Sequence, residues 1–543
     1  MAENDLILTD KLRKLQIESK PVQLEGKSTR SVEKGDGVEM SESSISDNSP
    51  LSVFLVSFKA ARTQWVARQA IIMISLLFRL AVGLGSFSGE NVPPLHGDFE
   101  AQRHWMEITY QLPMSQWYWY DLPYWGLDYP PLTAYHSWIM GWVGTLFNPV
   151  WFALNSSRGC EQLDLKSYMR STVVISDVLI YIPAVTMFIR WKINHTKLSP
   201  YFHTISTAMV LLQPSLILID HGHFQYNSVM LGFAIAAIAY ILEDRIVVGS
   251  VFFVMALTFK QMALYYAIPV FAYLLGICLY PRLNIARFIS LAIATILTFG
   301  VLVLPIGVSS GYSAANIKIQ LTQIMIRVFP FARGLWEDKV ANFWCATNII
   351  FKYKYIFSEL QLQRLSFAAT LISVLPSFIL LLRHPRKNAL VWAVSASAFG
   401  FYLFSFQVHE KSILLPLLPI TLQLVGELDI DIQCYIYWIN NVAYFSLWPL
   451  VKKDGLVMQY FLIGFLWNWL MHSYSRLPSS YLAKFIIVSS YLSITVLHIL
   501  EFVIEPPSRY PDLWIVANVE LCFSCFFIFA IWNNWMVYKT CMS

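Results

Sequence analysis

Residues 69–85 read Gln69-Ala70-Ile71-Ile72-Met73-Ile74-Ser75-Leu76-Leu77-Phe78-Arg79-Leu80-Ala81-Val82-Gly83-Leu84-Gly85 and form the first long apolar run of the chain. Similar runs recur as far as Tyr538, and about 20 mostly apolar residues are enough for one helix to cross a bilayer. Backbone groups in lipid must be hydrogen-bonded within the protein, and the sequence has no long alternating strands, so it predicts helices and not a barrel. The expected fold class is an all-α polytopic membrane protein with about 12–15 hydrophobic segments.

The composition supports the same class. Of the 543 residues, 56% are hydrophobic and only 13% are charged, and the mean hydropathy is +0.52, which excludes an ordinary soluble protein. The net charge of +5 is small and no basic tract is present, so we expect no nucleic-acid partner. The cysteines show no metal or disulfide spacing, and Cys522-x-x-Cys525 within an apolar segment indicates helix packing.

The N-terminal segment differs in kind from the rest. Residues 1–64 are rich in Ser, Glu, Lys and Asp, which predicts a disordered tail before a transmembrane domain at residues 65–543. Lys59, Arg62 and Arg68 precede the first span, which places the tail in the cytosol. The basic clusters at residues 190–197, 281–287 and 383–387 then read as cytosolic turns. The polar islands that fall on the luminal side are residues 88–131, 220–227, 259–261, 307–350 and 407–411.

Successive spans should alternate in direction between the cytosolic and luminal sides, and one segment does not fit this pattern. Two spans between residues 132 and 190 would put the basic cluster at Arg190 on the luminal side. We therefore expect residues 132–154, interrupted at Asn148-Pro149, to re-enter or to form two short pieces. The sequon at Asn155 would then be luminal and the sequon at Asn194 would not.

The first predicted luminal loop, residues 88–131, is rich in charged and aromatic side chains. It contains Gly97-Asp98-Phe99-Glu100-Ala101-Gln102-Arg103-His104-Trp105, followed by an aromatic stretch at residues 117–131. Ionisable groups at the membrane edge are costly, so their clustering indicates a functional site. The aromatic side chains can form an interfacial belt or can stack on sugar rings, and both interpretations stay open.

Two patterns in these islands suggest a metal site. The triplet Asp98-Phe99-Glu100 would suggest a metal-bound nucleotide in a soluble sugar transferase, but no glycine-rich phosphate loop accompanies it. His221-Gly222-His223 has no matching cluster and more often indicates hydrogen-bonded structure. We therefore expect neither a metal nor another cofactor. Lys260, which lies between two short apolar pieces, needs an anionic partner.

Five blocks of the sequence together resemble the endoplasmic reticulum glucosyltransferases of the lipid-linked oligosaccharide pathway, which belong to the GT-C superfamily. They are residues 97–107, 125–132, 221–227, 329–344 and 406–411. The resemblance extends from about Arg79 to the C-terminus. Gly-Asp-Phe-Glu-Ala-Gln-Arg-His-Trp in the first block is similar to the members that add the first α-1,3 glucose, whereas those that add the second typically have a diverged block.

The resemblance implies a multi-pass enzyme of the endoplasmic reticulum membrane with a luminal active site. It implies transfer of glucose, with inversion, from dolichyl phosphate glucose to the terminal mannose of the nine-mannose dolichyl-pyrophosphate-linked oligosaccharide, in N-glycan precursor assembly. The partners would be these two lipid-linked substrates and the surrounding membrane lipids, and the sequence does not identify protein partners. The alternatives are the second α-1,3-glucosyltransferase of the pathway, a related dolichyl-phosphate-sugar mannosyltransferase and, from a different class, a polytopic lipid or solute transporter.

The resemblance also suggests roles for individual residues. Asp98 is the predicted catalytic base, because a phosphate leaves without a general acid and one carboxylate is enough to take the proton of the attacking hydroxyl. The departing phosphate needs positive charge and hydrogen-bond donors, for which Arg333, His409 and Lys411 are predicted. The other predicted substrate-binding residues are Glu100, Arg103, His104, Trp105, Asp128 and His223, with Arg103, His104 and Trp105 expected to hold Asp98 and the acceptor sugar.

Overall fold

The computed structural model describes residues 49–58, 61–329 and 339–543. The chain divides into two compact units, Met1–Ser46 and Asp47–Ser543, and the described residues all belong to the second. Most of the predicted disordered tail, residues 1–48, lies outside the described residues. Regular structure begins before the predicted boundary at residue 64, because α2 (Pro50–Leu55) buries Leu51 and Leu55 and is followed by α3 (Ala61–Gly83).

The regular structure of the described residues is helical, and these residues include no strand. Among them, 7 helices are long and apolar enough to cross a membrane, or up to 8 if a bent pair, Tyr201–Leu211 and Pro214–Phe224, is one span. These findings confirm the predicted polytopic helical fold. Other apolar segments are shorter helices, such as Asn227–Leu242 and Val457–Met471, which accounts for part of the difference from the larger number of hydrophobic segments in the sequence.

The remaining helices follow in chain order. They are α4 (Asp98–Gln111), α5 (Pro131–Phe147), α6 (Leu163–Ser176), α7 (Ile182–Thr196), α8 (Pro200–Leu211), α9 (Pro214–Ile217), α10 (Asn227–Leu242), α11 (Ile246–Phe259), α12 (Ala267–Leu279), α13 (Ile285–Val308), α14 (Ala314–Val328), α15 (Phe343–Phe351), α16 (Tyr353–Ile356), α17 (Glu359–Arg383), α18 (Lys387–Phe404), α19 (Leu414–Leu422), α20 (Ile430–Ser446), α21 (Trp448–Lys453), α22 (Val457–Met471), α23 (Tyr481–Val503) and α24 (Leu513–Met542). Short 3₁₀ or π-helical turns connect them: η2 (Val56–Phe58), η3 (Met114–Gln116), η4 (Pro149–Phe152), η5 (Asp177–Tyr181), η6 (Leu218–Phe224), η7 (Gln261–Tyr266), η8 (Glu410–Ile413) and η9 (Ser473–Ser475).

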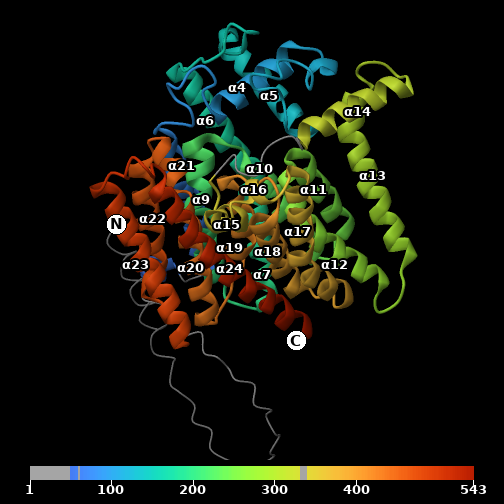
Figure 1. Cartoon of the computed structure of the whole chain (residues 1–543). Coiled ribbons are helices and arrows are strands. Elements are labelled where there is room, and N and C mark those ends of the chain that lie inside the picture. Colours follow the sequence, from blue (N-terminus) through green and yellow to red (C-terminus); the bar gives the residue numbers. More distant parts are fainter. Residues whose placement is uncertain (1–48, 59–60, 330–338) are drawn as a thin grey trace, which may run out of the picture. The chain divides into compact units, whose positions relative to one another are not determined.

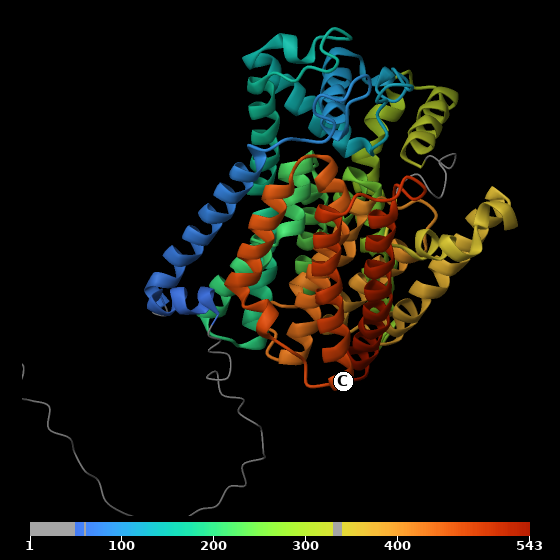
Figure 2. The ribbon, with the colours of Figure 1, turned by 60° about the vertical axis from the view of Figure 1, so that its left-hand side comes forward.

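Successive helices run back and forth between two ends of the bundle. α10, with 16 residues, leads away from η6 and α11 returns, and a helix of that length covers about 24 Å. The turn between α10 and α11 contains Asp244, which pairs with Lys387 at 2.6 Å. The C-terminus lies at this end, whereas α4 and α5 lie at the other (Figures 1 and 2). We refer to the end that carries α4 as the α4 end.

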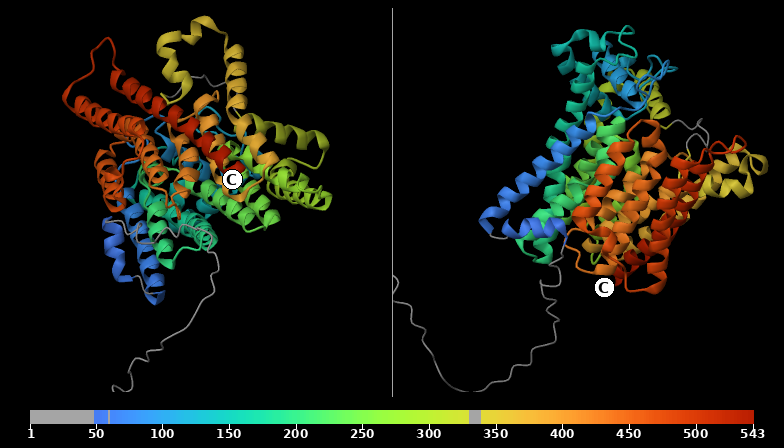
Figure 3. Two further views of the ribbon diagram at one scale, coloured as in Figure 1. Left: turned by 90° about the horizontal axis from the view of Figure 1, so that it is seen from below. Right: turned by 90° about the vertical axis from the view of Figure 1, so that its left-hand side faces the viewer.

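Residues 132–154 form two short pieces, which confirms one of the two arrangements predicted for them. α5 stops at Phe147, and η4 begins at Pro149, whose ring cannot continue the helical hydrogen bonds. Asn148 caps η4 by accepting a hydrogen bond from the backbone of Val150 at 3.0 Å. α5 packs along α4 and is not among the long apolar helices of the described residues. It belongs to a layer at the α4 end that a side view shows clearly (Figure 3).

The two large loops predicted to be luminal contact each other at the α4 end. α14, from the loop at residues 307–350, packs on the aromatic stretch of the loop at residues 88–131. The Trp119 indole donates to Gln320 Oε1 at 2.8 Å, and the Gln323 amide donates to the Tyr118 carbonyl at 2.9 Å. Side chains distant in sequence therefore fix the position of the first loop.

Some of the loop aromatics have a role that the sequence did not predict. Trp105, Trp117 and Tyr118 are buried in a small apolar cluster with residues of α14, separate from the main core. Trp119, by contrast, remains 46% exposed. The buried rings act as packing for the loop, beside the belt and sugar-stacking interpretations, which apply only to exposed rings.

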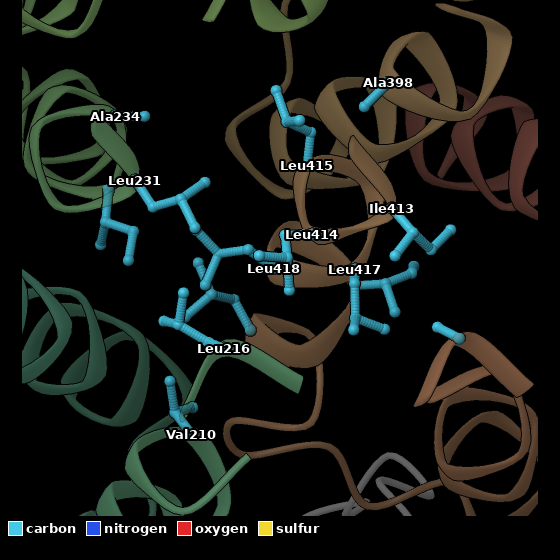
Figure 4. Packing of buried hydrophobic residues seen from close by; sticks show 14 of the residues in the cluster. Val210, Leu216, Leu231, Ala234, Ala398, Ile413, Leu414, Leu415, Leu417 and Leu418 are labelled. Carbon is cyan, nitrogen blue, oxygen red and sulfur yellow. The ribbon is translucent and has the colours of Figure 1, made fainter. Parts of the chain in front are cut away.

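A dense apolar core lies between α8, α9, α10, α18 and α19. Figure 4 shows Leu216 of α9 and Leu231 of α10 near Leu414 and Leu418 of α19. Lipid tails are as apolar as leucine, so within a membrane such contacts stabilise the fold mainly through close packing. η6 directly follows α9 and η8 directly precedes α19. The turns that carry His223 and Lys411 are therefore joined directly to helices of the main apolar core.

Candidate active site

Asp98 is the first residue of α4. The preceding residue, Gly97, approaches the chain so closely that a Cβ atom there would lie 2.6 Å from the carbonyl oxygen of Ser88. The Asp98 amide donates to the Ser88 hydroxyl at 3.3 Å. The helix dipole favours negative charge in a first turn. The local sequence therefore fixes the position of Asp98 and favours its ionised form.

Three side chains from two distant segments converge on one oxygen of Asp98. His223 Nε2 lies 2.8 Å from Asp98 Oδ2, and the Gln225 amide donates to the same oxygen at 2.6 Å. The Lys411 ammonium also donates to Oδ2. The contacts join the predicted islands at residues 88–131, 220–227 and 407–411. The structure thus brings together three of the predicted site residues, Asp98, His223 and Lys411.

The charge on Lys411 decides the ionisation of this site. Burial alone would raise the pKa of the Asp98 carboxyl, but the charge of Lys411 and the hydrogen bond from His223 hold that pKa well below its usual value. The side chains of Asp98 and Lys411 are still 23% and 20% exposed. Asp98 is therefore ionised at neutral pH and accessible. Its described hydrogen bonds all reach Oδ2, which leaves Oδ1 for a substrate.

An irregular turn aims His223 at Asp98. η6 is π-helical, and such turns are frequent at functional sites. Phe224 follows with a φ of 89°, a left-handed conformation that a bulky residue adopts only when its surroundings enforce it. The second ring nitrogen of His223, Nδ1, lies 2.5 Å from Asp454 Oδ2. The imidazole is thus held between two carboxylates, from the start of α4 and from the end of α21.

A second charged network lies further along α4. Arg103 donates to both oxygens of Glu100, at 2.7 and 2.6 Å, and to Glu107 at 2.8 Å. A third branch donates to the hydroxyl of Ser157 at 2.7 Å. Buried charges are tolerated when they are paired and hydrogen-bonded in this way. The network fastens α4 to the segment that follows η4.

The side chains of four residues predicted to bind substrate, Glu100, Arg103, His104 and Trp105, are buried within the protein. The side chains of Glu100, Arg103 and His104 are at most 3% exposed, and none of their described hydrogen bonds reaches Asp98. Trp105 is also buried and donates its indole N–H to the carbonyl of Trp125 at 3.0 Å. In this structure their polar groups hydrogen-bond within the protein and hold α4 in place. Their substrate-binding role stays a prediction.

The neighbours of Lys260 provide the negative charge that the sequence required. Its ammonium donates to Asn227 Oδ1 at 2.6 Å and lies 4.9 Å from the ring centre of Tyr129. It also interacts electrostatically with Asp98 and with Asp128, the predicted carboxylate before the Pro130-Pro131 turn. Asp128 and Lys260 therefore belong to the surroundings of Asp98.

The other predicted phosphate ligands have different positions. His409 precedes η8, and its backbone amide donates to the Ser412 hydroxyl at 3.3 Å, which stabilises the turn that presents Lys411. Arg333 lies outside the described residues.

Sequence reasoning missed two residues of this site. Gln225 lies in the block at residues 221–227, but the sequence does not predict a role for it. An amide side chain in a polar segment is only a weak signal of a contact with a catalytic acid. Asp454 stands in the polar turn Lys452-Lys453-Asp454-Gly455 of the otherwise apolar C-terminal third. The only signal in the sequence is that this charged turn lies between apolar segments. That signal does not predict which residue Asp454 contacts.

Comparison with known proteins shows the family of this chain. Residues 75–533 match the ALG6, ALG8 glycosyltransferase family. The chain is 47% identical over 523 residues to the dolichyl pyrophosphate Man9GlcNAc2 alpha-1,3-glucosyltransferase of Saccharomyces cerevisiae, covering 91% of this chain and 95% of that protein. It is 47% identical over 496 residues to the probable enzyme of the same name from Schizosaccharomyces pombe, covering 90% and 96%. The Gallus gallus protein of that name is 39% identical over 506 residues, covering 87% and 96%. The chain therefore belongs to the ALG6, ALG8 glycosyltransferase family and is a multi-pass membrane glycosyltransferase.

Proposed function

We propose that this enzyme transfers glucose from dolichyl phosphate glucose to the terminal mannose of the nine-mannose dolichyl-pyrophosphate-linked oligosaccharide, forming an α-1,3 linkage with inversion. The observation that carries the proposal is the ionised, accessible Asp98 beside Lys411, at one end of an apolar helical bundle. The names of the relatives support this acceptor and do not favour the second glucosyltransferase or a transporter. The step belongs to N-glycan precursor assembly in the endoplasmic reticulum membrane.

The geometry supports a single displacement at the sugar. As the acceptor hydroxyl oxygen bonds to C1 of glucose, the bond from C1 to the phosphate oxygen breaks and dolichyl phosphate leaves. Oδ1 of Asp98 takes the hydroxyl proton, because the three described donors occupy Oδ2. The Lys411 ammonium has three N–H donors, so it can hold Asp98 and a phosphate oxygen at the same time. This charge stabilises the leaving phosphate, and we propose that no metal takes part.

We further propose that the active site faces the lumen and the N-terminus the cytosol. Asp98, His223 and Lys411 lie at the α4 end, whereas Arg287 and Lys387 lie in the first turns of α13 and α18, and Lys387 pairs with Asp244 at the opposite end. Positively charged turns favour the cytosolic side. Both lipid-linked substrates would then meet the site at the luminal membrane surface.

The acceptor that receives glucose distinguishes the first glucosyltransferase of the pathway from the second. Purified enzyme with dolichyl phosphate glucose should add one hexose to the nine-mannose acceptor and none to the monoglucosylated one, as measured by mass spectrometry of the released glycans. The rate should be the same with and without EDTA. Transfer only to the monoglucosylated acceptor would identify the second glucosyltransferase instead. Absence of transfer to either acceptor would remove the proposed function.

Two glycosylation sequons test the orientation. Asn155 precedes the helical span Leu163–Thr196 and Asn194 lies near its far end, so one span separates them. Both residues are exposed. We expect a glycan at Asn155 and none at Asn194, measured as a gel shift that endoglycosidase and Asn155→Gln remove. A shift removed only by Asn194→Gln would reverse the orientation.

A further inference from the structure

The buried carboxylate of Asp454 has no role in the mechanism described so far. Its Oδ2 lies 2.5 Å from Nδ1 of His223, whose Nε2 lies 2.8 Å from Oδ2 of Asp98. The side chains of Asp454 and His223 are only 4% and 3% exposed. The three groups form a continuous line from the interior to the accessible base.

The number of hydrogen-bond donors on His223 limits the protonation states in which it can bond to both Asp98 and Asp454. An ionised carboxylate only accepts, and a neutral imidazole has one N–H, so it can donate to one of two carboxylates but not to both. With Asp98 ionised, both carboxylate contacts of His223 are hydrogen bonds only when the ring carries a proton on each nitrogen. The Lys411 ammonium lies 3.2 Å from Nε2, and in this state it donates to Asp98 and not to the ring. Asp454 supplies the second negative charge that makes a buried imidazolium tolerable.

Hydrogen bonds from distant segments hold the backbone at both Asp454 and His223. Asp454 follows the last residue of α21, and the Ser86 hydroxyl donates to its carbonyl oxygen. The carbonyl of Gly222, beside His223, accepts from Arg170 at 2.7 Å. The charged and titratable groups around the ring are Asp98 from α4, Arg170 from α6, Asp220 and His221 from η6, Lys411 from η8 and Asp454.

We propose that Asp454 is a positioning residue for glucosyl transfer: it keeps His223 doubly protonated, so that Nε2 occupies Oδ2 of Asp98 and leaves Oδ1 to receive the acceptor proton. The inference rests on the proposed function of Asp98. No proton leaves His223 in the step; the proton of the acceptor hydroxyl goes to Asp98 and later to water. A carboxylate that fixes the proton positions of an imidazole is a known way to tune a site.

Asp454→Asn should lower kcat by about 10- to 100-fold with little change in KM, since partners that orient a site residue have effects of that size. Without the second carboxylate, His223 should lose its extra proton more readily. The alkaline limb of the pH profile of kcat/KM should therefore move to lower pH. A purely structural role for Asp454 would lower the yield of active enzyme and leave the position of that limb unchanged.

Two comparisons complete the test. Asp244→Asn removes an exposed carboxylate at the opposite end and should leave both kcat and the pH profile as in the wild type. In a His223→Gln background, Asp454→Asn should have little further effect, because its action passes through the ring. Additive losses, or an unchanged pH profile in the single variant, would overturn the inference.

A measurement without turnover separates this inference from the proposed function. In ¹⁵N-histidine-labelled wild-type enzyme, the signal lost on His223→Gln should show both ring nitrogens protonated at neutral pH. A neutral ring for His223 would contradict the role of Asp454 even if glucose transfer is observed. A doubly protonated ring in an enzyme that transfers no glucose would instead refute the proposed function alone. The wild-type spectrum also decides the matter if Asp454→Asn does not fold.

Discussion

Replacing Asp98 with Asn should lower kcat by about 10³-fold, because an amide cannot accept the proton of the acceptor hydroxyl, and general-base catalysis contributes 10²- to 10⁴-fold. The side chain keeps nearly the same shape, and Oδ1 can still accept hydrogen bonds from the groups around it. Binding of dolichyl phosphate, measured by calorimetry, should therefore change far less than kcat. Turnover is measured with the nine-mannose acceptor at saturating donor.

Asp164→Asn is a matched control for this prediction. Asp164 also lies in the first turn of a helix, α6, but it is exposed. The substitution removes the same charge from a similar position in the helix dipole, and we expect activity close to that of the wild type. If Asp98→Asn retained turnover near the wild-type rate with unchanged binding, Asp98 would not be the base.

Lys411→Met should lower kcat/KM by about 10²- to 10³-fold, since removing one preorganised donor from a developing negative charge has effects of that size. It should also change the pH dependence. Lys411 holds the pKa of Asp98 well below its usual value, so its removal raises that pKa. More of the base is then protonated and inactive at a given acidic pH. The acidic limb of the kcat/KM profile should therefore move to higher pH.

Lys387→Met provides the comparison for Lys411. Lys387 is also paired with an aspartate, Asp244, but at the opposite end of the bundle. Its replacement should change neither the rate nor the pH profile. A Lys411→Met enzyme with an unshifted acidic limb would show that Lys411 does not control the ionisation of Asp98. A shifted limb with a normal rate would show control of Asp98 without any role at the phosphate.

The sequence predicted the class of fold well, because the length of an apolar run and the break at Asn148-Pro149 act locally. It also named Asp98, His223 and Lys411, which stand in recognisable blocks and which the structure brings together. It did not predict that the side chains of Glu100, Arg103 and His104 are buried. Residues three and four apart on a helix lie on one face and can pair with one another. The sequence does not show whether such a charged face points to a substrate or into the protein.

The sequence by itself determined that this chain spans a membrane, that its polar islands gather at one end, and which acid in the first loop is the candidate base. Only the tertiary structure showed which groups surround Asp98 and determine its ionisation. Gln225 and Lys411 reach Asp98 from 127 and 313 positions away in the sequence, and Asp454 reaches His223 from 231 positions away. The reason is physical: helix packing sets the distances between segments, and the strength of an ionic hydrogen bond depends on distance and burial, neither of which has a local signature in the sequence.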